Sequence, residues 1–180
     1  MSDHDPKYAI ARTNDETLLF LELHPCPDCG SIETPWDHGL ADDDGELVIR
    51  YAGICPGCGA EREYLFGLPE REAPLGPFPN FGGPEPSELL DAGQWMSVAD
   101  SAAASVPVDA PAGDEQARTV MAIARAAVEE VIKFVPPDAA AVPDDAFWTD
   151  EGRAVRDAEP GRFRVDRLLV VRDSYGEDDR

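Results

Sequence analysis

The sequence predicts an α+β fold, with strands in the first third of the chain and helices in the second half. Segments that alternate apolar and polar residues flank two cysteine pairs within residues 1–68, which predicts a small β module. Six prolines then fall within residues 69–86, a density at which regular structure does not persist, so this stretch is expected to wrap as an irregular connector. Over residues 87–180 the apolar positions recur at helical spacing, which predicts three or four helices.

The first expected element covers residues 13–24. Thr13 is followed three positions later by Glu16, the capping-box pattern of a helix start, and Pro25 would end the helix. The same residues also alternate well enough for a strand, and periodicity cannot decide between the two for so short an apolar run. Helix is the favoured interpretation.

Three strands are expected around the two cysteine pairs. Residues 31–36 are the candidate first strand, and residues 42–45, three aspartates and a glycine, have the composition of a turn. Residues 46–54 and 61–67 alternate and are rich in β-branched and aromatic residues, which is typical of strands. This order predicts a small antiparallel sheet.

The helical region has two clear start signals in its first half. Ser87 follows a proline and is expected to cap a helix that runs to about residue 104. Asp114 is expected to cap the clearest helix of the chain, whose apolar stripe continues to residue 135 and stops at two prolines.

Two shorter helices are expected near the C-terminus. Thr149 would cap the first, which ends at about residue 157. The second is expected over residues 162–175, with Leu168 and Leu169 among its inward-facing residues.

All four cysteines lie in two copies of the motif Cys-Pro-x-Cys-Gly. Two such pairs in a small chain predict a tetrahedral zinc site. The proline pre-sets one dihedral angle of a tight turn, and the final glycine tolerates a positive φ, so both sulfurs of a pair can face one ion. Four thiolates leave no open coordination position, so a single structural zinc ion is expected. The ligands are Cys26, Cys29, Cys55 and Cys58.

These motifs resemble the knuckles of the zinc ribbon family, over residues 26–66. The resemblance implies a β ribbon whose two knuckles hold one zinc ion. It implies little about function, because ribbons occur in nucleic-acid binders, enzyme subunits and adaptors. Disulfides or a redox pair are the alternative uses of the cysteines. Because the N-terminus shows no secretion signal, a reducing cytoplasm is the expected location, which disfavours disulfides.

The charge of the chain limits its partners. It has 37 acidic and 15 basic residues, a net charge of −22. A field of this sign repels nucleic acid and anionic membranes, so neither is expected to bind. A basic protein is the expected partner, although solubility or adaptation to a salt-rich cytoplasm explains the acidity equally well. The densest acidic patch, and the candidate partner-binding surface, consists of Asp42, Asp43, Asp44 and Glu46.

The leading expectation is a non-enzymatic protein-binding module in which zinc only sets the shape. In size, charge and lack of recognisable catalytic groups, the chain resembles the acidic immunity proteins of bacterial toxin systems, which implies neutralisation of a basic toxin or nuclease. The alternatives are an adaptor or subunit of the transcription or translation machinery, and an enzyme with an unrecognised site. His24 is not expected to bind the metal, and His38, beside Asp37, is expected in a surface turn.

Overall fold

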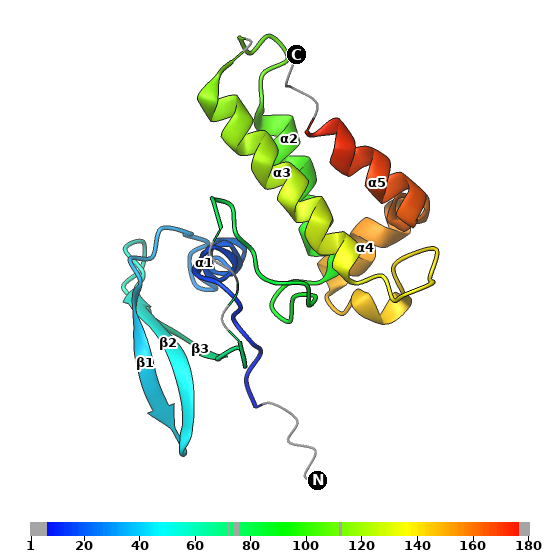
Figure 1. Ribbon diagram of the computed structural model, residues 1–180. Coiled ribbons are helices and arrows are strands. Elements are labelled where there is room, and N and C mark those ends of the chain that lie inside the picture. The colour runs from blue at the N-terminus through cyan, green and yellow to red at the C-terminus, as the bar shows by residue number, and fades with distance from the viewer. Residues whose placement is uncertain (1–6, 72, 74–75, 112, 177–180) are drawn as a thin grey trace. The chain divides into compact units, whose positions relative to one another are not determined.

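The chain forms two compact units, Met1–Gly83 and Pro84–Arg180, in a computed structural model that describes residues 7–71, 73, 76–111 and 113–176. In these residues the first unit is a three-stranded antiparallel sheet with one α-helix, and the second unit contains four α-helices (Figure 1). The predicted α+β fold class is therefore confirmed. No helix in the described part of the chain is both long and apolar enough to cross a membrane.

The sheet of the first unit has the strand order β1-β2-β3. Two of the three expected strands, over residues 46–54 and 61–67, are confirmed at both ends, and Val48, Tyr51 and Phe66 are among their buried residues. Residues Asp44 and Gly45, with φ values of 54° and 86°, form a two-residue turn between the first two strands. Positive φ at both positions is typical of the type I′ hairpin turn. The strands are β1 (Asp37–Asp43), β2 (Glu46–Ile54) and β3 (Glu61–Gly67).

The expectation of a first strand over residues 31–36 is wrong. These residues are irregular, and the first strand is Asp37–Asp43 instead. Its sequence, DHGLADD, contains no β-branched residue, so propensity does not place it. The tight turn sets the register, and the residues that precede the turn pair with β2 whatever their own preference.

The helix α1 (Asn14–Leu23) confirms the favoured interpretation of residues 13–24. The Thr13 hydroxyl caps it by accepting a hydrogen bond from the Glu16 amide at 3.2 Å. The helix packs on the sheet through Phe20, whose ring meets those of Tyr64 and Phe66 edge-on, with centroids 5.6 and 5.5 Å apart. This aromatic contact fixes α1 over the face that Tyr64 and Phe66 share.

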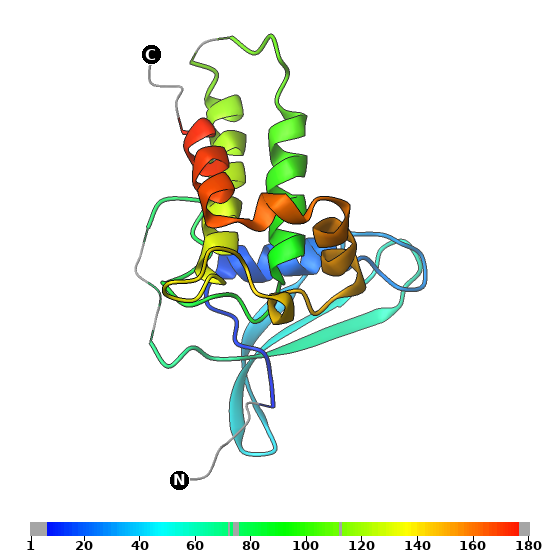
Figure 2. The ribbon, with the colours of Figure 1, turned by 90° about the vertical axis from the view of Figure 1, so that its right-hand side faces the viewer.

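The second unit is built on a pair of neighbouring helices, α2 and α3 (Figure 2). The helix α5 lies along α3, and α4 contacts α2. Buried apolar side chains between these helices, including Trp95 and Val128, form the core. The helices are α2 (Ala92–Ser105), α3 (Glu115–Lys133), α4 (Asp150–Ala158) and α5 (Val165–Ser174), with two short 3₁₀ helices, Asp144–Ala146 and Pro160–Phe163.

Two of the three expected helix caps in this unit are confirmed. Asp114 caps α3 and Thr149 caps α4. The expectation that Ser87 caps the preceding helix is wrong, because its hydroxyl accepts the amides of a local turn, and α2 begins only after Asp91. Asp91 and Gln94 form a complete capping box, which satisfies more backbone donors than a single serine can.

The last helix is shorter than the sequence predicts. A 3₁₀ helix, Pro160–Phe163, takes the start of the expected segment, and α5 begins at Val165. Leu168 is fully buried, as expected, whereas Leu169 is 36% exposed, so the prediction that it faces inward is wrong. A ten-residue helix that packs along one neighbour buries only a narrow stripe.

Asp91 also joins two helix starts within the second unit. Its carboxylate is fully buried and accepts hydrogen bonds from the Gln94 amide at 2.9 Å, the Thr149 amide at 2.8 Å and the Thr149 hydroxyl at 2.7 Å. Because a helix N-terminus carries a partial positive charge, two such ends stabilise the buried carboxylate. This single side chain therefore couples the start of α2 to the start of α4.

Candidate metal centre

The four cysteine sulfurs lie within 4.8 Å of one another. Cys26 Sγ is 3.6 Å from Cys58 Sγ, and Cys29 Sγ is 3.5 Å from Cys55 Sγ. A tetrahedral zinc ion with bonds of about 2.3 Å requires sulfur atoms about 3.8 Å apart, close to these separations. The four predicted ligands are therefore brought together in an arrangement that fits one metal ion.

Each cysteine motif folds into the same tight turn. The Gly30 amide donates a hydrogen bond to the Cys26 carbonyl at 2.7 Å, and the Gly59 amide donates to the Cys55 carbonyl at 2.8 Å. Gly30 and Gly59 have φ values of 75° and 78°. The predicted need for a residue that tolerates positive φ after each cysteine pair is confirmed. The first motif follows α1, and the second lies between β2 and β3, so a bound ion would tie these segments together.

Cys55 is the most acidic of the thiols whose pKa is shifted. Burial raises the pKa of its thiol, but the backbone amide of Gly57 and the Cys29 thiol oppose burial, as does the Cys58 amide, and together they lower the pKa to about 6. Cys55 is thus ionised at neutral pH even before a metal ion binds.

The pKa values of the exposed thiols Cys29 and Cys58 are raised, unlike that of Cys55. The Ser31 amide lowers the pKa of Cys29. The hydrogen bond between the Cys29 and Cys55 thiols and desolvation raise it, and the net pKa is raised. The Ala60 amide lowers the pKa of Cys58, but desolvation and the neighbouring thiols raise it to about 12. Several thiolates cannot form side by side without a cation, and a metal ion supplies the missing positive charge.

Arg62 bonds to the segments before and after the first cysteine motif, a role that the sequence analysis missed. Its buried guanidinium donates hydrogen bonds to the His24 carbonyl at 2.5 Å and to the Thr34 hydroxyl at 3.0 Å. It also lies 4.9 Å from the centre of the Trp36 ring. The available signal is the alternation of β3, which places Arg62 on the same face as the aromatic residue Tyr64.

The two histidines near these elements lie outside the four-thiol cluster. His24 Nδ1 is 2.7 Å from the Phe20 carbonyl, and its ring stacks on that of Phe20. His38 is exposed, as expected, but it lies in β1 and not in a turn. Its ring stacks on Tyr51, with centroids 5.0 Å apart.

The acidic patch lies where β1 and β2 meet. Its members are Asp42, Asp43, Asp44 and Glu46. Within it, Asp43 accepts hydrogen bonds from the Lys7 ammonium at 2.6 Å and from the Tyr8 hydroxyl, while Asp42 accepts the Gly45 amide at 3.1 Å. Asp44 also accepts a longer hydrogen bond from Lys7, at 3.4 Å, so three of the four carboxylates have structural contacts in addition to their charge.

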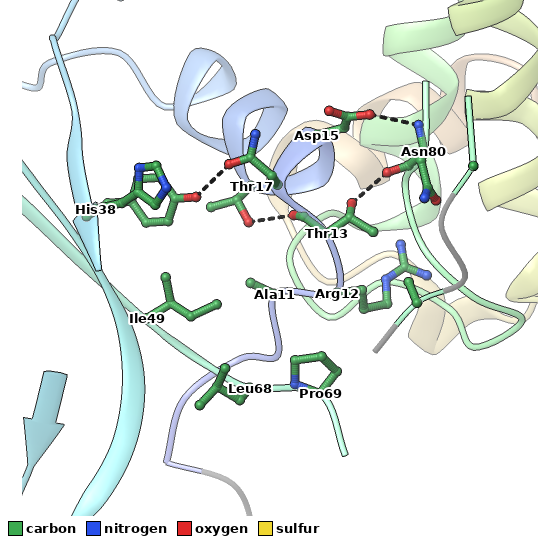
Figure 3. Close-up of a pocket in the computed structure, with 14 residues that line it drawn as sticks. Ala11, Arg12, Thr13, Asp15, Thr17, His38, Ile49, Leu68, Pro69 and Asn80 are labelled. Atoms are coloured by element: carbon green, nitrogen blue, oxygen red, sulfur yellow. Dashed lines mark hydrogen bonds between the residues drawn. The ribbon is translucent and has the colours of Figure 1, made fainter. Parts of the chain in front are cut away.

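A cavity of about 500 Å³ lies between the start of α1 and the sheet (Figure 3). Ala11, Ile49 and Leu68 give it apolar walls. On one side the Thr13 hydroxyl donates to the Asn80 carbonyl at 2.6 Å, and the Asn80 amide donates to a carboxylate of α1. These polar groups hold the loop around residue 80 against α1.

Comparison with known proteins found no match: no family model fits the chain, and no curated protein or solved structure is significantly similar to it.

Proposed function

We propose that the first unit is a zinc ribbon that holds one structural zinc ion through Cys26, Cys29, Cys55 and Cys58. The observation that carries this proposal is the cluster of four sulfurs within 4.8 Å, each supplied by one of two matched turns. An all-sulfur tetrahedral set favours zinc among the common divalent ions. Four protein ligands fill the coordination sphere, so the ion stabilises the fold and is not a centre of catalysis.

We propose further that this unit is a binding module for a basic protein. Residues 37–54, which form the hairpin of β1 and β2, contain five acidic residues and one basic residue, Arg50. Arg50 is itself paired with Glu63 on β3, 2.5 Å away, and Lys7 pairs with Asp43. The remaining carboxylates keep the hairpin strongly negative, which would speed the approach of a cationic partner. The more specific expectation, inhibition of a basic toxin or nuclease, has the support of size and charge alone.

Capture of a partner from native lysate at low and high salt tests the binding proposal. The informative variant is Asp44→Asn with Glu46→Gln, because Asp42 and Asp43 make the shorter bonds to the turn and the N-terminal segment, whereas Asp44 is 3.4 Å from Lys7. Its matched control is Glu22→Gln with Glu33→Gln, which removes the same charge from exposed positions elsewhere in the unit. We expect the first variant to slow association severalfold and to flatten its salt dependence, and the control to change both much less. Equal on-rates for the two variants would contradict the proposal.

A further inference from the structure

The strand β1 is an edge strand whose outer side is unpaired by any described segment of the chain. The two-residue turn makes Asp43 and Glu46 a hydrogen-bonded pair, and such pairs alternate with non-bonded pairs along an antiparallel ladder. The backbone N–H and C=O groups of His38, Leu40 and Asp42 therefore point away from β2. They form a row of unsatisfied donors and acceptors of the kind that pairs with another strand.

Large apolar side chains lie next to this open edge. Leu40 is 66% exposed and Leu47 is 54% exposed. The register places Leu40 opposite Ile49, so both lie on the face of the sheet that borders the cavity. Figure 3 shows Ile49 beside that cavity, with His38 stacked on a ring next to it. Next to the open edge, beyond the part that α1 covers, this face is thus apolar and exposed around Leu40 and Leu47, with Asp42 at its end.

The acidic residues on and beside β1 favour a basic strand at its open edge over a second copy of this chain. The opposite face of β1 carries Asp37 and Asp43, and Asp44 and Glu46 lie at its end. Edge-to-edge pairing of two copies of this chain would bring two such acidic strands together, which like-charge repulsion opposes. A strand with basic residues would gain attraction at the same positions.

We propose that the outer edge of β1 binds an extended segment of a basic protein, which joins the sheet as a fourth strand. This inference rests on the proposed function and specifies how the partner is held. Backbone pairing with His38, Leu40 and Asp42 supplies the affinity, and alternation supplies the specificity. Apolar side chains of the partner lie beside Leu40 on the cavity face. Its lysines or arginines lie on the other face, next to Asp37 and near Asp43, which also pairs with Lys7.

Two peptides of identical composition test this binding mode. One is a heptapeptide of alternating lysine and valine, and the other contains the same residues as a block of lysines followed by a block of valines. Each is titrated into the zinc-loaded full-length protein by calorimetry, and backbone amide shifts are followed by NMR. We expect the alternating peptide to bind about tenfold or more tightly than the block peptide, and to shift the amides of His38, Leu40 and Asp42 most.

A proline substitution on the edge separates backbone pairing from side-chain contact. Leu40→Pro removes an outward N–H that β2 does not use, and edge strands tolerate proline at such positions. Leu40→Ala is the matched control, because it removes the same apolar side chain and keeps the N–H. We expect the proline variant to bind the alternating peptide about fivefold more weakly than the alanine variant does. If the proline variant loses zinc, alternating peptides with methylated valine amides apply the same test to the unmodified protein.

Equal binding of the two peptides would overturn the strand-addition proposal and leave charge-based binding of a basic partner intact. Failure of both peptides to bind, amide shifts elsewhere in the chain, or self-association through β1 in sedimentation experiments would also overturn it. The proposed function itself is decided separately, by the on-rates of the Asp44→Asn, Glu46→Gln variant with the captured partner.

Discussion

Replacement of Arg62 tests how the candidate metal centre is joined to the sheet. In Arg62→Met the guanidinium is lost, while an unbranched apolar side chain of similar reach fills much of its volume. The half-buried His24 carbonyl then loses its charged donor at 2.5 Å, which costs about 1–3 kcal/mol. The lost contact with the Trp36 ring costs about 1 kcal/mol more. The Thr34 hydroxyl also loses its donor, which costs about 1 kcal/mol, whereas the methionine avoids the cost of burying a charge, so we expect a net loss of about 3 kcal/mol.

The matched control is Arg50→Met on the neighbouring strand. Its side chain is 50% exposed and pairs with Glu63, and exposed pairs of this kind contribute about 0–1 kcal/mol. For a unit of this size, 1 kcal/mol corresponds to about 4–8 °C in Tm, so Arg62→Met should lower the Tm of the first unit by about 12–24 °C. Cobalt substituted for zinc gives a thiolate absorption band that reports on this unit alone. If both variants melt within about 3 °C of each other, Arg62 does not hold the first cysteine motif in place.

Two further predictions concern the second unit and the pH dependence of metal binding. Asp91→Ala should destabilise the second unit by about 2–4 kcal/mol in urea unfolding, because it leaves buried amides of α2 and α4 without an acceptor. Asp114→Ala removes a more exposed cap and should cost about 1 kcal/mol, so equal losses would contradict the role of Asp91. The raised pKa values of Cys29 and Cys58 keep both thiols protonated at neutral pH when no metal is bound. Zinc must displace at least these two protons, so its affinity should rise about 100-fold or more per pH unit between about pH 6 and pH 8, and competition with a chelating dye that gives less than tenfold would refute this.

The sequence predicts those elements whose positions depend on local chemistry. Apolar and polar residues alternate in the sequences of β2 and β3. Asp114 and Thr149 are good helix caps that stand directly before the helices α3 and α4. The strand β1 could not be placed in this way, because its residues have little strand preference and only its pairing with β2 makes it a strand. Ser87 does not cap α2, because Asp91, four residues later, accepts more backbone amides. The number of amides that each residue can reach is known only from the packed structure.

The same distinction applies to the candidate site: local sequence predicts its ligands but not the contacts that support them. The four cysteines follow from motif spacing, because a tetrahedral ion imposes that spacing on the chain. The support from Arg62 depends on three segments meeting in space, and the pairing of Lys7 with Asp43 depends on where the N-terminal segment crosses the hairpin. Tertiary contacts of this kind leave only a weak trace in the sequence, such as the position of Arg62 among the aromatic residues of β3.

Metal removal tests the claim that one zinc ion bound by four cysteines holds the first unit together. Elemental analysis of the purified protein should give one zinc ion per chain, and Cys29→Ser should lose it. A strong chelator should collapse the dispersed NMR signals of β1, β2 and β3, because structural zinc in isolated fingers contributes on the order of 10 kcal/mol. A metal-free protein that keeps these signals and its full thermal stability would contradict the claim.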